Sequence, residues 1–282
     1  MVSVIVAVYN GEKFIKETVE RALEQTYKPE EVIVIDDAST DGTQEVIQKN
    51  FHDRVYYYRN TKNMERCYSR NRGYALSKGE FVFFLDHDDL WEVNHLERTL
   101  NQWGQAHMLY SFPRKLIDQE GRLIKRSGKE LPEDPYRVVF SGMVGYPSAT
   151  AFRRGYFLEY VDKYLVREDW EVFLRASLLG YNIKITDTDT VMIREHSGRT
   201  SKSRRLYEGT IRVYEDYVSK IPEAYLPYFL FHVGDVCMRF GELKKGWSMV
   251  LKAIRQEPEL LTSGRNLLSI IKRGFRFWRS NV

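Results

Sequence analysis

The sequence has few cysteines and no long apolar run, and both absences narrow the kind of protein it can be. Its 282 residues include only two cysteines, Cys67 and Cys237, which excludes a disulfide framework and a thiolate metal cluster. No stretch reaches the ~18 to 20 apolar residues of a membrane-spanning helix. The chain also opens directly into a strand-like run, without the charged leader and apolar core of a signal peptide. We therefore expect a cytoplasmic protein.

Net charge is small but unevenly distributed. The whole chain has a formal charge of +4, whereas residues 199–282 hold 16 Lys and Arg against 8 Asp and Glu, a local charge of +8. This leaves about −4 for residues 1–198. Charge therefore argues against nucleic-acid binding by the larger, N-terminal part, while the tail can meet an anionic partner.

Apolar periodicity predicts alternating strands and helices in the first hundred residues. The predicted strands are 2–9, 31–36, 54–58 and 80–85, and the predicted helices between them are 12–25, 43–49 and 67–77. Such alternation predicts parallel strands joined by right-handed crossovers. Further along, the sequence indicates a hairpin at 116–124, a helix at 168–179 and helices from about residue 223 onward.

Two of the predicted strands end in clustered carboxylates. Phe81–Leu85 runs into Asp86, Asp88 and Asp89, and Val32–Ile35 runs into Asp36 and Asp37. Ligands of open α/β sheets bind beyond the carboxyl ends of the strands, where such acids can hold a hard cation and its phosphate ligands. The alternative is that these acids form turns or cap the next helix. We expect the two acidic strand ends to lie side by side at one sheet edge.

Five motifs in register carry a family resemblance. They are Val2–Asn10, Asp36–Thr43, Arg70-Asn71-Arg72-Gly73, Asp86-His87-Asp88-Asp89 and Glu168-Asp169. Over roughly residues 2 to 200 the chain resembles the family 2 glycosyltransferases, nucleotide-sugar enzymes of the GT-A fold. The resemblance implies an α/β fold with a Rossmann-like, mostly parallel sheet flanked by helices and a C-terminal helical appendage. It also implies a glycosyltransferase domain at 1–205, with a nucleotide-binding half at 1–105 and an acceptor half at 106–205, followed by a helical region at 206–282.

The resemblance implies nucleotide-binding roles for five residues. Ala7 and Tyr9 would pack on the base and ribose, and Asp37 would accept a hydrogen bond from the uracil ring, which favours a uridine-diphosphate donor. Arg70 would face the base or the diphosphate, and Asp86 would contact the ribose. For Arg70 the alternative is a solvated position on a helix face.

The resemblance also implies a metal and a catalytic base. Asp88 would bind Mn²⁺ or Mg²⁺, and His196 would complete the metal shell or donate to phosphate, with Arg199 as a second cation at the diphosphate. Asp169 would take the proton of the acceptor hydroxyl. A helix-capping Asp169 and a surface His196 are the structural alternatives.

The function implied is that of an inverting glycosyltransferase. It would move a sugar from a UDP-sugar to a hydroxyl acceptor such as a growing glycan or a lipid-linked oligosaccharide. The alternative is a non-catalytic nucleotide-binding or scaffolding protein that acts through its helical tail. A dinucleotide-dependent oxidoreductase is disfavoured, because Tyr9-Asn10-Gly11-Glu12 replaces the G-x-G-x-x-G turn.

The tail, residues 265–282, has the composition of a basic amphipathic segment. Between Arg265 and Arg279 it holds five cations, no acid and several large apolar residues, as in helices that lie in a membrane interface. We expect peripheral association with the inner face of the membrane. The alternative is a helix that docks its apolar side on the protein and leaves its cations in water.

Overall fold

The computed structural model describes residues 1–196 and 203–279, which form two compact units that interleave along the chain. The N-terminal unit comprises Met1–Gly128, Tyr146–Asp162 and Leu179–Gly198, and the C-terminal unit comprises Lys129–Gly145, Lys163–Leu178 and Arg199–Val282. Each unit has its own buried core, so each is described separately.

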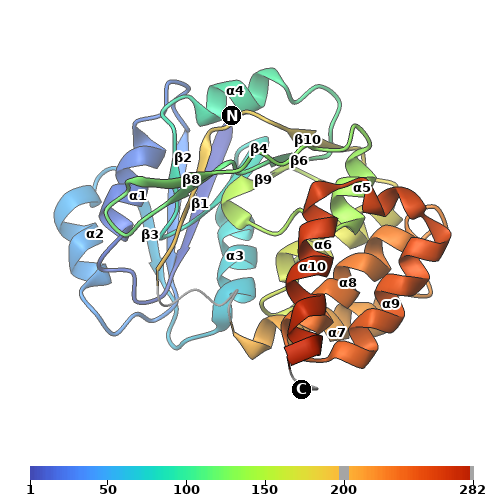
Figure 1. Ribbon diagram of the computed structural model, residues 1–282. Helices are drawn as coiled ribbons and strands as arrows, with labels where there is room; N and C mark the ends of the chain where they lie inside the picture. Colours follow the sequence, from blue (N-terminus) through green and yellow to red (C-terminus); the bar gives the residue numbers. More distant parts are fainter. Residues whose placement is uncertain (197–202, 280–282) are drawn as a thin grey trace. The chain divides into compact units, whose positions relative to one another are not determined.

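The N-terminal unit is built on a seven-stranded sheet (Figure 1). In spatial order its strands are β10 (Ile183–Thr186), β6 (Met108–Ser111), β9 (Thr150–Arg153), β4 (Phe81–Asp86), β1 (Val2–Val8), β2 (Glu31–Asp36) and β3 (Tyr56–Arg59). The four strands β4, β1, β2 and β3 are parallel, as predicted, and β9 is antiparallel to both of its neighbours. The apolar runs of β1, β2 and β4 are buried because helices cover both faces of a parallel sheet.

Strand order corrects one expectation. The two acidic strand ends do not lie side by side, because β1 runs between β4 and β2. In this register Ala7 pairs with Asp86 on one side and with Ile35 on the other, and Val8 pairs with Asp36. The end of β1 therefore separates the two groups of acids by one strand.

Helices flank this sheet. α1 (Ile15–Leu23) and α2 (Thr43–Phe51) cover one face and α3 (Glu65–Leu76) covers the other, as right-handed crossovers require (Figure 1). α3 approaches β1 closely at Gly73, where an added Cβ would lie 2.4 Å from Cγ2 of Ile5. Helix α4 (His95–Asn101) comes soon after β4 in the chain. The short helix η1 (Pro147–Ala149) directly precedes β9.

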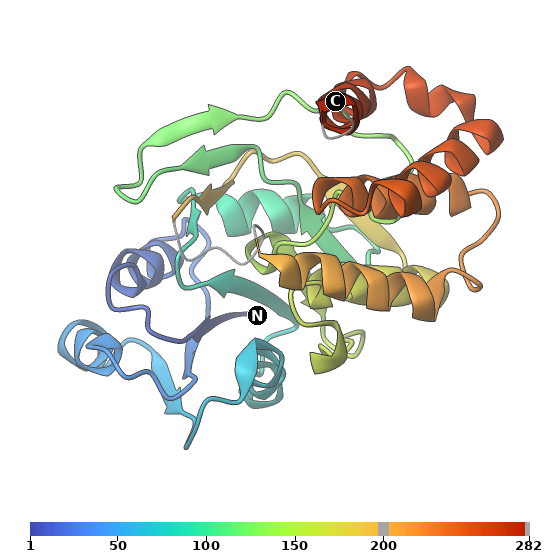
Figure 2. The same cartoon turned by 60° about the horizontal axis from the view of Figure 1, so that its bottom comes forward.

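A second, four-stranded sheet lies in the same unit. Its order is β5 (Leu90–Trp91), β11 (Val191–Arg194), β7 (Lys115–Ile117) and β8 (Leu123–Arg126). Figure 2 shows β7 and β8 in green as the hairpin predicted at 116–124, with β11 in gold beside them. β5 directly follows the acids at the end of β4. Its pairing with β11 therefore brings Val191 and Met192, about a hundred positions further along the chain, close to this acidic strand end.

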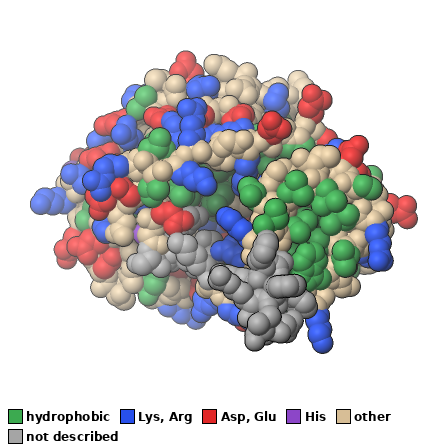
Figure 3. Space-filling view, in the orientation of Figure 1, with side chains coloured by type: hydrophobic (Ala, Val, Ile, Leu, Met, Phe, Trp, Pro, Cys, Tyr) green, Lys and Arg blue, Asp and Glu red, His purple; other side chains and the backbone are tan. Residues whose placement is uncertain are grey.

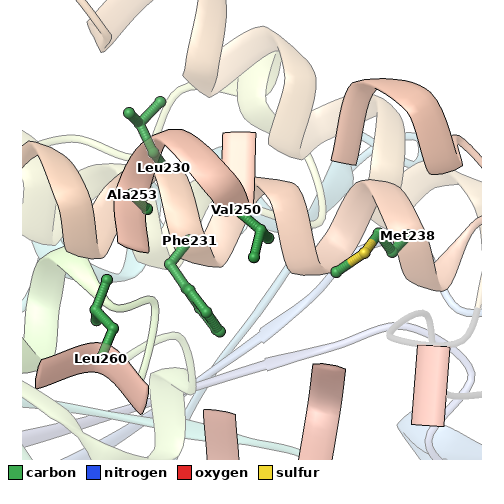
Figure 4. Packing of buried hydrophobic residues seen from close by; sticks show 6 residues of the cluster. All are labelled: Leu230, Phe231, Met238, Val250, Ala253 and Leu260. Carbon is green, nitrogen blue, oxygen red and sulfur yellow. The ribbon is translucent and has the colours of Figure 1, made fainter. Parts of the chain in front are cut away.

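The C-terminal unit is helical. Its elements are α5 (Pro135–Phe140), α6 (Glu168–Leu178), α7 (Arg204–Tyr217), α8 (Leu226–Arg239), α9 (Leu243–Gln256), η4 (Pro258–Leu261) and α10 (Gly264–Arg279), with η2 (Asp162–Tyr164) at its border. Helices α8 and α9 cross closely at Gly234 and Gly246, where a Cβ added to either glycine would lie within 2.8 Å of the other helix's backbone oxygen. Figure 4 shows the apolar cluster around this crossing, formed by Leu230, Phe231, Met238, Val250, Ala253 and Leu260.

Helix α10 meets the C-terminal unit through a face that is partly polar and partly apolar. It continues through Gly274. Arg273 forms an ion pair with Asp235 of α8 at 3.1 Å, and Ile270 packs against the apolar cluster of the unit. Its apolar residues Leu267, Leu268 and Ile271 are 41%, 59% and 52% exposed. Figure 3 shows hydrophobic side chains gathered on a face of this unit. Thus, in the part of α10 whose side chains are described, Arg273 and Ile270 contact the unit, whereas Leu267, Leu268, Ile271 and Lys272 are exposed.

Within the described residues, no helix combines the length and the apolar composition needed to cross a bilayer.

Candidate active site

Three carboxylates meet in the turn that follows β4. Asp86, Asp88 and Asp89 each bring a carboxylate oxygen within 4.8 Å of the others, and residues 86–89 are called the acidic turn below. The turn lies at the carboxyl edge of the sheet, where α/β folds bind ligands. The chain folds this way locally because a buried apolar strand ends here in residues that favour turns.

Asp89 holds the turn in place. Its Oδ2 accepts a hydrogen bond from Ser148 Oγ at 2.6 Å, and its Oδ1 accepts one from the backbone N–H of Arg194 at 2.9 Å. Burial, followed by the nearby charges of Asp88 and Asp86, raises the pKa of Asp89 well above its usual value. Both oxygens of Asp89 therefore make hydrogen bonds that hold the turn. Asp89 is also the carboxylate whose ionised form is destabilised by burial and by its charged neighbours.

Asp88 is the carboxylate whose ionised form is stabilised. Burial opposes its ionisation, but the hydrogen bond with His196 and the charges of His87 and His196 lower its pKa to about 2. The Oδ2 to Nε2 distance between Asp88 and His196 is 2.7 Å. An ionised Asp beside two further carboxylates and an imidazole is a donor set that suits a hard divalent cation, which would also relieve the repulsion at Asp89.

Arg70 is committed to Asp86. Its Nη2 lies 2.9 Å from Asp86 Oδ1, its side chain is 3% exposed, and its guanidinium stacks 5.3 Å from the ring centroid of Tyr160. Ser148 Oγ accepts the backbone N–H of Asp86 at 3.0 Å. The structure thus brings Arg70, Asp86 and Asp88 together, with Asp86 fixed from both sides.

Asp37 directly follows β2, and one of its two carboxylate oxygens already accepts two hydrogen bonds. Its Oδ1 accepts hydrogen bonds from Asn60 Nδ2 at 2.6 Å and from the backbone N–H of Met64 at 2.8 Å. No described residue donates to its Oδ2, although the side chain is nearly buried. One carboxylate oxygen therefore remains available to a donor group of a ligand.

Two strained backbone positions shape the same edge. Asn10 and Ala38, which follow β1 and β2, have φ values of 52° and 60°, a region that non-glycine residues rarely occupy. Hydrogen bonds hold the strain: Asn10 Oδ1 accepts from Thr40 N, and Ser39 Oγ accepts from Asn10 N. Such strain is common at ligand sites, and it leaves Tyr9 44% exposed beside half-buried Ala7.

Arg194 links the acidic turn to two distant segments, a role that the sequence analysis does not identify. Its Nε donates to the Asp88 carbonyl at 2.7 Å, its Nη1 donates to the Gln119 carbonyl at 2.7 Å, and its Nη2 pairs with Glu17 at 2.7 Å. The side chain is 1% exposed. The sequence signal for this linking role is the single arginine that ends the apolar run 191–194. An arginine on a buried strand needs several hydrogen-bond acceptors, which other segments must supply.

The other predicted residues lie elsewhere. Asp169 belongs to the C-terminal unit as the second residue of α6, two positions beyond the N-cap residue Arg167, and it is half-buried. Next to it, Trp170 is buried and donates to the Val139 carbonyl at 2.9 Å. Arg199 lies outside the described residues.

The fold and the acidic turn define a class, the GT-A glycosyltransferases. Structural neighbours share the fold: S. aureus TarS 1-349 in complex with UDP-GlcNAc has a TM-score of 0.59 and 18% identity, covering 93% of this chain and 91% of that one. The mannosyltransferase PcManGT from Pyrobaculum calidifontis, in complex with GDP-Man and Mn²⁺, has a TM-score of 0.62 and 19% identity, covering 99% and 83%.

Sequence comparison gives the family. The family model "Glycosyl transferase family 2" matches residues 3–165. The chain is also 28% identical over 204 residues to the Escherichia coli UDP-Glc:alpha-D-GlcNAc-diphosphoundecaprenol beta-1,3-glucosyltransferase WfaP, covering 72% of this chain and 81% of that protein. The chain belongs to glycosyl transferase family 2 and is a glycosyltransferase, and nothing in these comparisons supports the non-catalytic alternative.

We predict that Arg194→Met lowers the free energy of unfolding by about 1–3 kcal/mol, the range for leaving a buried hydrogen-bond acceptor without its donor, because the carbonyls of Asp88 and Gln119 lose a donor whereas the ion-pair partner Glu17 is 43% exposed. Arg122→Met is the matched control, since Arg122 makes its ion pairs on the surface and such pairs contribute little. Urea denaturation measures both variants. Equal stability of the two variants would show that Arg194 does not hold the acidic turn.

Proposed function

We propose that this glycosyltransferase transfers a sugar from a UDP-sugar to a hydroxyl group with inversion, and the proposal rests chiefly on the acidic turn. Asp88 is held ionised next to Asp86 and His196, the arrangement that a nucleotide diphosphate and a divalent cation require. Mn²⁺ or Mg²⁺ held by Asp88 and His196 would neutralise the charge that develops on the leaving diphosphate. Support for Mn²⁺ comes from the complex of PcManGT.

Uridine is the proposed base of the donor. The open Oδ2 of Asp37 is an acceptor, and the uracil ring presents an N–H donor, whereas the saturated Oδ1 keeps the carboxylate oriented. Ala7 and Tyr9 would pack on the base and ribose, and Asp86 would accept from the ribose while Arg70 fixes its orientation. The names of WfaP and of the TarS complex, each with a UDP-sugar, support the same base.

Asp169 is the proposed general base. Its carboxylate would accept the proton of the acceptor hydroxyl as that oxygen forms a bond to the anomeric carbon, and the bond from this carbon to the diphosphate breaks with its electron pair on the nucleotide. Asp169 lies in the first turn of α6, where the helix N-terminus favours negative charge. Arg199 remains a proposed second cation at the diphosphate.

The proposed acceptor is a growing glycan or a lipid-linked oligosaccharide. The name of WfaP gives a diphosphoundecaprenol-linked acceptor for that protein. The exposed apolar face of α10, formed by Leu267, Leu268 and Ile271, would keep this protein at a membrane surface where such acceptors are found. We propose that it acts in the cytoplasm as a peripheral protein of the inner membrane face. The proposed glycosyltransferase domain ends at residue 205, near the start of α7, and the proposed helical region follows from residue 206.

We predict that UDP binds with a divalent cation and that Asp88→Asn removes most of this dependence. Titration calorimetry with Mn²⁺ and with a chelator should show at least about a tenfold difference in affinity for the wild type, about 1.4 kcal/mol, and little difference for the variant. Asp162→Asn, an exposed Asp of the same unit, is the control and should behave as the wild type. Equal affinity of the wild type with and without chelator would refute the metal role.

We predict that Asp169→Asn lowers turnover by about 10² to 10⁴, the range for a lost general base, and leaves UDP affinity unchanged. Initial rates at saturating donor measure the effect. Glu208→Gln, an exposed acid on α7 of the same unit, should keep wild-type turnover. A variant that loses stability but retains near wild-type turnover would make Asp169 a structural residue of α6.

We predict that the combined substitution of Leu267, Leu268 and Ile271 by Ser lowers partitioning onto anionic lipid vesicles by about tenfold or more, since each exposed side chain contributes through apolar burial. Vesicle co-sedimentation measures the effect. The control changes Leu123 and Ile124 to Ser, an equally exposed apolar pair on β8. If both variants pellet like the wild type, the outward face of α10 does not bind membranes.

A further inference from the structure

A small cavity in the C-terminal unit has a lining rich in hydrogen-bond donors. It lies among α8, η4, α10 and the residue that follows α5, and its volume is about 30 Å³. One water needs roughly 10–15 Å³ measured in the same way, so the cavity has space for a group larger than a single water. The polar residues of its lining that matter here are Ser141, His232, Asp235, Arg265, Asn266 and Ser269.

His232 contributes an unused N–H. Arg167 Nη2 lies 2.7 Å from His232 Nε2, and because a guanidinium can only donate, Nε2 must be the acceptor. Burial, followed by the charges of Arg167, Arg265 and Arg273, holds the pKa of His232 well below its usual value, so the ring is neutral and Nδ1 carries its hydrogen. This Nδ1 is buried without a hydrogen-bond partner among the described residues.

Arg265 contributes a cation whose nearest opposite charge, Asp235, is shared with Arg273. Its guanidinium forms no ion pair or hydrogen bond with the described part of the chain, although burial lowers its pKa. The guanidinium offers five donors in a planar fork that matches an oxyanion. A partly buried guanidinium without acceptors is costly, so an acceptor from outside the chain would stabilise it.

The one carboxylate in the lining is already used. Asp235 accepts from Ser269 Oγ at one oxygen and pairs with Arg273 Nη2 at 3.1 Å through the other. Asn266 spends its Nδ2 donor on the Leu260 carbonyl at 2.8 Å. Arg265 and Arg273 face the single carboxylate of Asp235, which leaves a net positive charge beside the cavity.

We propose that this cavity binds a small oxyanion of the phosphate or sulfate type, which accepts hydrogen bonds from His232 Nδ1 and from the Arg265 guanidinium. Water alone could satisfy the imidazole but would leave the net positive charge beside the cavity unbalanced. The cavity lies on the side of α10 opposite Leu267, Leu268 and Ile271, because Arg265, Asn266 and Ser269 occupy the other helix face. The ligand is therefore a dissolved anion rather than a lipid headgroup at the apolar face.

The site is connected to the start of α6. Arg167, which holds His232 Nε2, also donates from Nε to Thr210 Oγ1 at 2.8 Å, and its carbonyl accepts the backbone N–H of Glu171 at 2.9 Å. A bound anion would orient His232 and thereby Arg167, two residues before Asp169. This connection to catalysis rests on the proposed role of Asp169, whereas the anion site itself does not.

Titration of the full-length protein with sodium phosphate, in chloride buffer at constant ionic strength and with a chelator present, tests the site. The chelator excludes metal-mediated phosphate binding at the acidic turn. We expect saturable binding by the wild type and at least tenfold weaker binding by Arg265→Gln. Arg255→Gln, an exposed arginine of α9, removes the same charge and should bind as the wild type does. Absence of binding by the wild type, or equal binding by the two variants, would overturn the proposal.

A second variant tests the proposal in case the first variant is destabilised. If Arg265→Gln melts at a lower temperature without phosphate, His232→Phe decides, because it removes the Nδ1 donor and keeps a ring against Trp170, whose centroid is 4.8 Å away. Phosphate affinity equal to that of the wild type in His232→Phe would place the anion outside this cavity. Both variants should retain Mn²⁺-dependent UDP binding, so loss of phosphate binding leaves the donor site proposal intact.

Discussion

The buried guanidinium of Arg194 is the constraint on which the candidate active site depends. Three carboxylates in one turn repel one another, and the turn keeps its shape only because its backbone is fixed from outside. The backbone N–H of Arg194 donates to Asp89, and its Nε donates to the Asp88 carbonyl. Its Nη1 donates to the Gln119 carbonyl in the hairpin turn, and its Nη2 pairs with Glu17 of α1. One side chain thus ties the second sheet and a helix of the first layer to the acidic edge.

Hydrogen bonding divides the acids of this edge into structural and available ones. Asp36 accepts from Ser39 N and pairs with Arg59 at 3.2 Å, and Asp89 has both oxygens occupied. Asp37 keeps one open oxygen, and Asp88 has its ionised form stabilised beside half-buried neighbours. A carboxylate is costly to bury unless it is paired, so the acids without a full set of protein donors are those with capacity for a ligand.

Much of this arrangement follows from sequence, because its signals are local. The apolar strands, their parallel pairing and the acids at their ends come from periodicity and from motifs of a few residues, and the hairpin at 116–124 was predicted correctly. Ser148 and Arg194 gain their roles from contacts 59 to 177 positions away, which no local pattern encodes. The strand order β4-β1-β2 and the ion pair of Arg273 with Asp235 of α8 likewise depend on tertiary packing. Amphipathic composition predicts a helix, but it does not tell which face meets the protein.

The interleaving of the two units separates the proposed binding and catalytic roles. Apart from Arg199, the residues proposed for the donor nucleotide and its metal lie in the N-terminal unit, and Asp169 lies on α6 in the unit formed with α7 to α10. Inside that unit the start of α6 is held by Arg167, which depends in turn on Thr210 of α7 and His232 of α8. Changes in packing among these helices therefore act on the position of Asp169 without passing through the sheet that holds the donor. Substitutions in the helical unit should for that reason alter turnover while leaving nucleotide affinity in place, a separation that a single compact domain would not provide.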